Sequence, residues 1–252
     1  MDQSSLAAHQ FGVSAQSYLE SPVHAQGPDL DHLRALAESR RPASVLDLGC
    51  GAGHASFAIA PFAEEVIAYD VSAPMVALVA AEGARRGLAS LGVKEGVAEA
   101  LPFEDQRFDW VVTRLSAHHW SDVQKALREA RRVLKDHGTF TIIDIVAPER
   151  PLFDTILQSV EILRDASHVR NYRASEWQAL LTQAGFQVTD TETWKIPITF
   201  KAWIARMHTP ELRVEAVRSV FAGAAPEVRD YFRVQDDCSF EIDCAWMTAH
   251  PY

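Results

Sequence analysis

The sequence is poor in cysteine, with only 3 in 252 residues. Cys50, Cys238 and Cys244 are an odd number and show no C-x-x-C spacing, which argues against a disulfide framework or a zinc site. Glycine and proline are also sparse, at 12 each, so collagen-like and low-complexity architectures are excluded. A chain of this length buries enough surface to fold without such links. We expect one domain over residues 1–252 in a reducing compartment, the cytoplasm.

Long apolar runs and clustered positive charge are missing as well. Residues 76–81 form an apolar run far shorter than the roughly 20 residues of a membrane-spanning helix. The first ten residues carry Asp2 and lack the basic-then-apolar order of a secretory signal. A net charge of −10 disfavours nucleic acid. We expect a small-molecule substrate, no nucleic acid and no membrane span. The oligomeric state stays open, a homodimer included.

Short apolar runs alternate with stretches of helical spacing. Strands are predicted at residues 45–48, 65–69, 93–98, 108–113 and 139–146, and helices at 30–39, 55–63, 73–86 and 123–134, with residues 135–138 as a basic last turn and glycine stop. Beyond residue 150 we predict helices at 152–166 and 175–184, a helical stretch at 200–221, and last strands at 186–193 and 239–247. Repeated strand and helix predict an α/β fold with a parallel sheet.

The strongest local pattern is a strand that runs into a glycine loop, Asp47-Leu48-Gly49-Cys50-Gly51-Ala52-Gly53, and opens a helix. Exposed backbone N–H groups and the positive helix end suit an anionic group, either a diphosphate or an amino-acid carboxylate. The dinucleotide pattern G-x-G-x-x-G is not met, because His54 or Ser56 stands where the last glycine belongs. A nicotinamide cofactor is therefore disfavoured.

A second acid follows at the end of the next strand. Asp70 stands 23 residues after Asp47, where a carboxylate can accept hydrogen bonds from both ribose hydroxyls of a nucleoside cofactor. The alternative is a helix-capping aspartate before Val71 and Ser72.

With these motifs, the chain resembles the class I S-adenosylmethionine-dependent methyltransferases, in particular the type 11 proteins and the group related to ubiquinone/menaquinone C-methyltransferases. The resemblance covers roughly residues 11–140. It rests on the glycine loop, Asp70, Met75, Ala98-Glu99-Ala100-Leu101-Pro102-Phe103, Phe108-Asp109, Ala117-His118-His119-Trp120, and Arg132-Val133-Leu134-Lys135 before Gly138.

The resemblance implies a Rossmann-like, seven-stranded, mostly parallel sheet with helices on both faces, a reversed last hairpin and a helical cap insertion after the fifth strand. It also implies S-adenosylmethionine as cofactor, with the methionine end at Asp47, Gly49, Gly51 and Gly53, the ribose at Asp70, the adenine face at Val71 and Met75, and the adenine edge at Ala98 and Glu99. Where the family has an aspartate for the adenine amino group, this chain has Val97. Glu99 or a backbone carbonyl is the expected replacement.

The resemblance also divides the chain into segments. Residues 1–29, which include Phe11, Tyr18 and His24, would fold over the cofactor, with Tyr18 at the methionine portion, or else form a plain surface segment. Residues 30–150 would form the cofactor-binding core, residues 151–173 the cap, and residues 174–252 the last strands with added helices.

Two clusters are candidates for acting on the acceptor. His118 and His119 follow the fourth strand at the carboxyl edge of the sheet, where a general base would stand for a protonated nucleophile; alternatively they only support the loop. Cap residues Arg164, His168, Arg170 and Tyr172 could hold a substrate carboxylate or phosphate, or could form a solvated helix face. Trp203, Arg206 and His208 are a weaker second wall. Adjacent histidines without nearby ligand spacing predict no metal site.

Three functions follow from this sequence. The first is methyl transfer from S-adenosylmethionine to a small molecule, with an aromatic or quinone-like carbon or oxygen favoured by the resemblance. The second is a non-catalytic S-adenosylmethionine-binding protein. The third, an NAD(P)-dependent oxidoreductase, is disfavoured by the glycine spacing.

Overall fold

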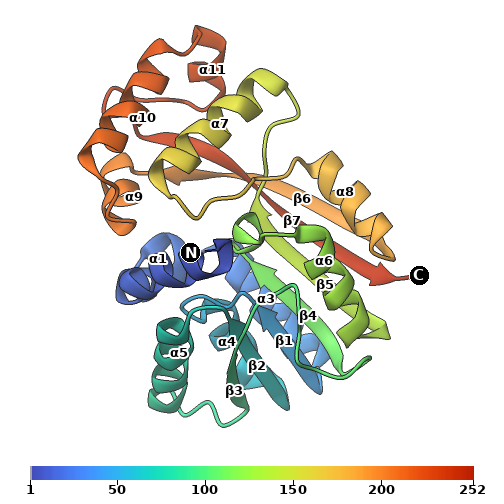
Figure 1. Ribbon diagram of the computed structural model, residues 1–252. Helices are drawn as coiled ribbons and strands as arrows, with labels where there is room; N and C mark the ends of the chain where they lie inside the picture. Colours follow the sequence, from blue (N-terminus) through green and yellow to red (C-terminus); the bar gives the residue numbers. More distant parts are fainter. Residues whose placement is uncertain (1) are drawn as a thin grey trace.

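One seven-stranded sheet organises the chain, in the order β3-β2-β1-β4-β5-β7-β6 (Figure 1). The computed structural model describes residues 2–252, without the side chains of residues 22 and 23. The strands are β1 (Ser44–Leu48), β2 (Glu65–Asp70), β3 (Leu91–Glu95), β4 (Phe108–Arg114), β5 (Leu134–Ile145), β6 (Phe186–Ile198) and β7 (Phe240–Pro251). Strands β1 to β5 pair in parallel, and β7 runs antiparallel to both β5 and β6. The predicted reversed last hairpin is confirmed.

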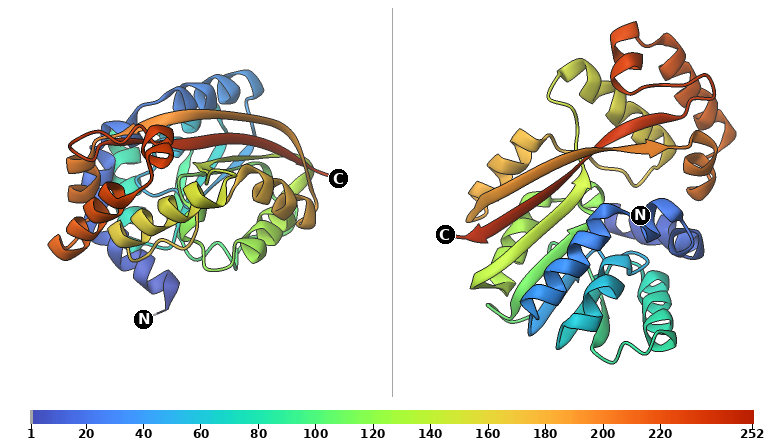
Figure 2. Two further views of the ribbon diagram at one scale, coloured as in Figure 1. Left: turned by 90° about the horizontal axis from the view of Figure 1, so that it is seen from above. Right: turned by 180° about the vertical axis from the view of Figure 1, so that it is seen from behind.

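Helices cover both faces of the sheet, because side chains alternate along each strand. Val45 of β1 belongs to the core that includes α3 (Pro28–Arg40) and α4 (His54–Ile59). Its neighbour Leu46 belongs to the core on the other face, which includes α6 (Val123–Val133) and α8 (Ala174–Gln183). Helix α5 (Ala73–Arg85) lies on the α4 side, where Val79 meets Phe57 and Ala68. Figure 2 shows α3 on the back of the sheet, opposite α6. The predicted α/β architecture is therefore confirmed.

Residues 3–19 form a helix that the sequence did not predict. Helix α1 (Gln3–Leu19) begins at Asp2, whose carboxylate accepts a hydrogen bond from the N–H of Ser5, and is followed by the short α2 (Pro22–Ala25). Ala7, Phe11, Ser14 and Tyr18 share a face by their spacing of three and four. Two of these four are small, so the apolar period is weak. The helix lies where the parallel strands end, in contact with α5 and α9 (Phe200–Arg206) (Figure 1).

Two insertions build the helical layer beyond the carboxyl ends of the strands. Helix α7 (Pro151–Arg164) follows β5 and packs on α10 (Glu211–Gly223) and α11 (Pro226–Tyr231), which lie between β6 and β7 with α9 (Figure 1). Phe153, Leu157 and Val160 are the buried apolar side of α7. The cap therefore contains residues from both insertions.

Four predicted boundaries were wrong. Strand β3 ends at Glu95, because the chain then passes under Tyr69, whose hydroxyl donates to the Val97 carbonyl and would collide with a Cβ at Gly96. Residues 135–138 are not a helix end, since β5 starts at Leu134, which pairs with Phe108. The last strands are longer than predicted, with twelve paired positions between β6 and β7.

The predicted helix at residues 200–221 is broken into α9 and α10. His208 takes a positive φ of 50°, and Pro210 disfavours a helical residue before it. In the described part of the chain, no helix is long and apolar enough to span a membrane.

Candidate active site

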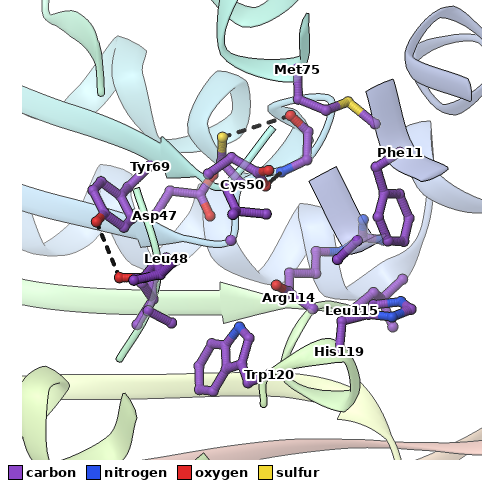
Figure 3. Close-up of a pocket in the computed structure, with 18 of the residues that line it drawn as sticks. Phe11, Asp47, Leu48, Cys50, Tyr69, Met75, Arg114, Leu115, His119 and Trp120 are labelled. Carbon is purple, nitrogen blue, oxygen red and sulfur yellow. Dashed lines mark hydrogen bonds between the residues drawn. The ribbon is translucent and has the colours of Figure 1, made fainter. Parts of the chain in front are cut away.

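A pocket opens at the carboxyl ends of β1, β2 and β4, beneath α1 (Figure 3). The space between its walls, including the part open to solvent, is about 940 Å³. Of the residues predicted for the cofactor, it is lined by Tyr18, Asp47, Gly49, Gly51, Asp70, Val71, Met75, Ala98 and Glu99. Gly53 is not in the lining. Its φ of +83° and the close approach of Val79 and Phe57 require glycine for packing instead.

Most N–H groups of the glycine loop donate within the protein, and among the described residues only that of Ala52 has no partner. The N–H groups of Gly49 and Cys50 both donate to the Tyr69 carbonyl, and that of Gly51 donates to Oδ2 of Asp70 at 2.8 Å. In α4, which follows the loop, the N–H of Ser56 donates to Oδ2 of Asp47 at 2.9 Å. Two carboxylates of the protein therefore already occupy donors that a ligand anion would need.

Asp47 is buried and Asp70 is half-buried beside the loop to which they are hydrogen-bonded. Burial raises the pKa of Asp47 to about 6, although hydrogen bonds from Ser56 oppose the shift. Burial also raises the pKa of Asp70, against the hydrogen bonds from Ser72 and Gly51. Oδ1 of Asp47 is buried and has no hydrogen-bond partner among the described residues. This oxygen can accept a hydrogen bond from a cationic ligand group.

The far end of the pocket is apolar. Met75 is fully buried and yet lines the pocket with Val71 and Ala98. Glu99 uses Oε1 to accept hydrogen bonds from the N–H and hydroxyl of Ser121, both at 2.8 Å. The loop at residues 121–122 is thereby tied to this end of the pocket.

His118 and His119 are brought together at η2 (Ala117–His119), with ring centroids 4.2 Å apart, but they differ in surroundings. His119 lines the pocket, and its Nδ1 lies 3.1 Å from the Ser167 carbonyl. Burial, followed by the charge of His118, lowers the pKa of His119 to about 4. His118 lies behind it, outside the lining, with Nδ1 2.6 Å from Oδ1 of Asp144. Burial would lower the pKa of His118, but the Asp144 carboxylate outweighs it and raises that pKa.

The four cap residues predicted for the substrate do not line this pocket. Arg164 is buried against Trp203, to whose carbonyl Nε donates. Nε2 of His168 lies 3.0 Å from Oε1 of Gln158. Arg170 pairs with two carboxylates of the protein, and Tyr172 packs edge-on against Trp177. The structure gives each of them a partner within the protein.

The sequence reasoning missed three groups at the site. Arg114 ends β4 and lines the pocket, Trp120 lies beside Gly49, and Asp144 reaches His118 from β5. Each stands within the carboxyl-terminal part of a strand or just after one, which was the available signal. No group of three or more His, Cys, Asp or Glu side chains that could hold a metal occurs among residues 2–252.

Known proteins resemble this chain in sequence and in fold. A family model described as a methyltransferase domain matches residues 46–142. The uncharacterised protein YafE of Escherichia coli (strain K12) is 44% identical over 202 residues, which are 80% of this chain and 98% of YafE. The Bacillus subtilis protein YcgJ is named as an uncharacterised methyltransferase. Its crystal structure matches this chain with a TM-score of 0.84 and 36% identity, and the match covers 88% of this chain and 97% of YcgJ.

This chain belongs to the class I S-adenosylmethionine-dependent methyltransferases, type 11. The methyltransferase is therefore an enzyme that uses S-adenosylmethionine, and the predicted cofactor is confirmed. A more distant relative, the demethylmenaquinone methyltransferase of Chlorobaculum parvum, is 28% identical over 196 residues, 70% of this chain and 77% of that protein.

The pocket of the methyltransferase fits the chemistry of its cofactor. S-adenosylmethionine carries a positive amino group, a negative carboxylate and a sulfonium. The buried, unpartnered Oδ1 of Asp47 suits the amino group, and the lining includes one cationic side chain, that of Arg114. The apolar surface at Met75 and Ala98 suits a purine ring.

Proposed function

We propose that the methyltransferase methylates a small molecule at an aromatic or quinone-like carbon or oxygen held beside Phe11, Tyr18 and His119. The observation that carries this proposal is a continuous series of edge-on ring contacts in the pocket. Ring centroids are 4.7 Å apart for His24 and Tyr18, 5.4 Å for Tyr18 and Phe11, and 4.7 Å for Phe11 and His119. Such an aromatic wall favours a planar acceptor. The demethylmenaquinone methyltransferase similarity supports the same class.

The cofactor lies along the pocket from its amino group at Asp47 to its adenine at Glu99. The amino group binds Oδ1 of Asp47, the methionine chain lies along Gly49 and Gly51 below Tyr18, and the ribose hydroxyls donate to Asp70, whose oxygens retain free lone pairs. Val71 and Met75 contact the adenine face, and Ala98 and Glu99 its edge, where Oε2 of Glu99 accepts from the adenine amino group. Gly53 supports the loop without contacting the cofactor.

We assign the general base to His118. The bound sulfonium supplies an electrophilic methyl group and leaves as a neutral thioether. The acceptor loses one proton as its nucleophile bonds to the methyl carbon. The imidazole of His118, which lies behind His119, takes that proton through one bridging water, because the Asp144 carboxylate stabilises the imidazolium. His119 stays neutral and orients the acceptor from the pocket wall. Alignment of the reacting groups and exclusion of water by α1 supply the rest.

We also propose a role for each segment of the chain. Residues 1–29 cover the cofactor, residues 30–150 bind it, and residues 151–173 form a cap with α9 to α11. Three cysteines, all free, support a reducing compartment such as the cytoplasm.

Calorimetric titration with S-adenosylmethionine, S-adenosylhomocysteine and NAD(H), on the wild type and Asp70→Ala, tests the cofactor site first. We expect adenosyl-ligand binding that Asp70→Ala weakens at least tenfold. Cofactor with a deuterated methyl group is then offered with phenols, hydroquinones and carboxylic acids, and separately with protein and RNA. Label on a ring carbon or ring oxygen supports the acceptor class. Label found only on macromolecules or aliphatic carboxylates contradicts it.

A further inference from the structure

The methionine carboxylate of the cofactor needs a cation in this pocket. The loop N–H groups of Gly49, Cys50 and Gly51 donate to other groups of the protein, and Asp47 and Asp70 add negative charge beside them. A third carboxylate without a counter-charge would be repelled. The N–H of Ala52 has no partner among the described residues, but it carries no net charge and cannot offset these two carboxylates.

Arg114 is the one arginine or lysine among the described residues that line the pocket. The three histidines in the lining, His24, His54 and His119, have pKa values lowered by burial and are neutral at pH 7. The guanidinium of Arg114 is always protonated. It is therefore the fixed positive charge of the site.

Only some of the hydrogen-bond donors of this guanidinium are paired within the protein. Nε donates to Oδ2 of Asp29, and Nη1 donates to the carbonyl oxygen of His24 at 3.0 Å. Nη2 has no hydrogen-bond partner among the described residues. The Arg114 side chain lies toward Phe11 under α1 in Figure 3, and only 7% of it is exposed. A buried cation with a free donor faces the space below the helix.

We infer that Arg114 binds the methionine carboxylate of the cofactor and, through Asp29 and the His24 carbonyl, fastens residues 24–29 over it. The assignment rests on the placement of the methionine end proposed above, but not on the identity of the acceptor. One guanidinium thus contacts the cofactor, His24 of α2 and Asp29 of α3. The carboxylate becomes a condition for closing the N-terminal segment over the site.

Two product analogues that differ in one group test this inference. S-adenosylhomocysteine has the carboxylate, and decarboxylated S-adenosylhomocysteine lacks it. We expect wild type to bind the first more tightly. Arg114→Gln should weaken S-adenosylhomocysteine roughly 10- to 100-fold, the range of a hydrogen bond to a charged group, and change binding of the decarboxylated analogue less than threefold. Hydrogen exchange should show residues 3–25 protected by S-adenosylhomocysteine and not by the analogue.

Arg114→Gln leaves Asp29 buried without its partner, so the double variant Arg114→Gln/Asp29→Asn controls for local unfolding. It should keep the same loss of discrimination with native stability. Asp70→Ala is the matched control at the other end, since it should weaken both analogues equally. If Arg114→Gln weakens both analogues equally, or neither, the carboxylate assignment is wrong. If Asp70→Ala leaves both unchanged, the placement of the cofactor itself fails.

Discussion

Nδ1 of His118 lies 2.6 Å from Oδ1 of Asp144, a carboxylate that is 1% exposed. The two residues come from neighbouring parallel strands, just after β4 and at the end of β5. Oδ1 of Asp144 also accepts from the N–H of Ile145 at 2.8 Å. The carboxylate is therefore fixed in place and orients the imidazole.

Asp144→Asn should move the acid limb of the kcat profile to lower pH. A base works when deprotonated, so wild-type activity falls as pH drops through the raised pKa of His118. Without the charge of Asp144, burial dominates and lowers that pKa. The plateau should fall roughly 10- to 1,000-fold, because the imidazole also loses orientation. Rates between pH 5 and 9 measure both effects, and circular dichroism checks the fold.

His118→Gln distinguishes between the two histidines as the general base. The pKa of His119 is lowered to about 4, so a base at this position would give an acid limb near pH 4. If His118 is the base, the wild-type limb lies above pH 6.5 and His118→Gln removes it. An unchanged limb in His118→Gln contradicts the assignment.

Asp47→Asn should stabilise the unliganded protein at pH 8 and weaken binding of the cofactor. Burial raises the pKa of Asp47 from 3.8 to about 6, so the folded state binds more protons and loses stability as pH rises from about 4 to 6. The shift of 6 − 3.8 = 2.2 corresponds to about 3 kcal/mol. Asparagine keeps one oxygen for both donors of Ser56 and carries no charge.

Urea unfolding at pH 5 and pH 8 measures this effect. We expect a gain of about 1–3 kcal/mol for Asp47→Asn at pH 8 and a flatter pH dependence. Ser56→Ala is the control, because it retains the carboxylate but removes a hydroxyl donor that lowers the Asp47 pKa, and it should therefore strengthen the pH dependence. A loss of stability at pH 8 in Asp47→Asn would show that the ionised carboxylate is stabilising.

Gly49→Ala and Gly51→Ala should fail in different ways. At Gly49, with φ +73°, a Cβ would collide with the Ser116 side chain, so we expect a loss of about 2–4 kcal/mol in unfolding free energy. At Gly51, with φ +50°, no atom lies within 4 Å, so the loss is about 1–2 kcal/mol. The new methyl would enter the cofactor space and should weaken S-adenosylhomocysteine at least tenfold. Wild-type affinity in Gly51→Ala would contradict the proposed cofactor position.

Arg170→Met tests the cap residue that the sequence assigned to the substrate. Nη2 of Arg170 lies 3.0 Å from Asp154 and 3.2 Å from Glu176. Because the arginine is one-third exposed, we expect a stability loss of about 1 kcal/mol at most. The KM of any acceptor found in the panel should change less than twofold. A tenfold rise in KM at unchanged stability would return Arg170 to the substrate site.

Local pattern was enough for the order of the core elements. The run at Val45 and Leu46, the glycine loop and Asp70 each depend on neighbours in sequence, and the predicted elements from α3 to α6 appear in the structure in their predicted order. The ends of the strands depended on contacts between residues that are distant in sequence. The hydroxyl of Tyr69 above Gly96 ends β3, and the pairing of Leu134 with Phe108 starts β5.

The sequence by itself determined the family, the sheet and the nine predicted cofactor residues that line the pocket, because parallel strands bring their carboxyl ends to one edge. Only the tertiary structure decided charge and partnership there. It gives His118 the carboxylate of Asp144, Arg170 the carboxylates of Asp154 and Glu176, and the pocket the cation of Arg114. Those pairs join residues 6 to 85 positions apart. Burial and neighbouring charges set the pKa of each group and decide which of its donors and acceptors remain unpaired. These surroundings cannot be inferred from spacing along the chain.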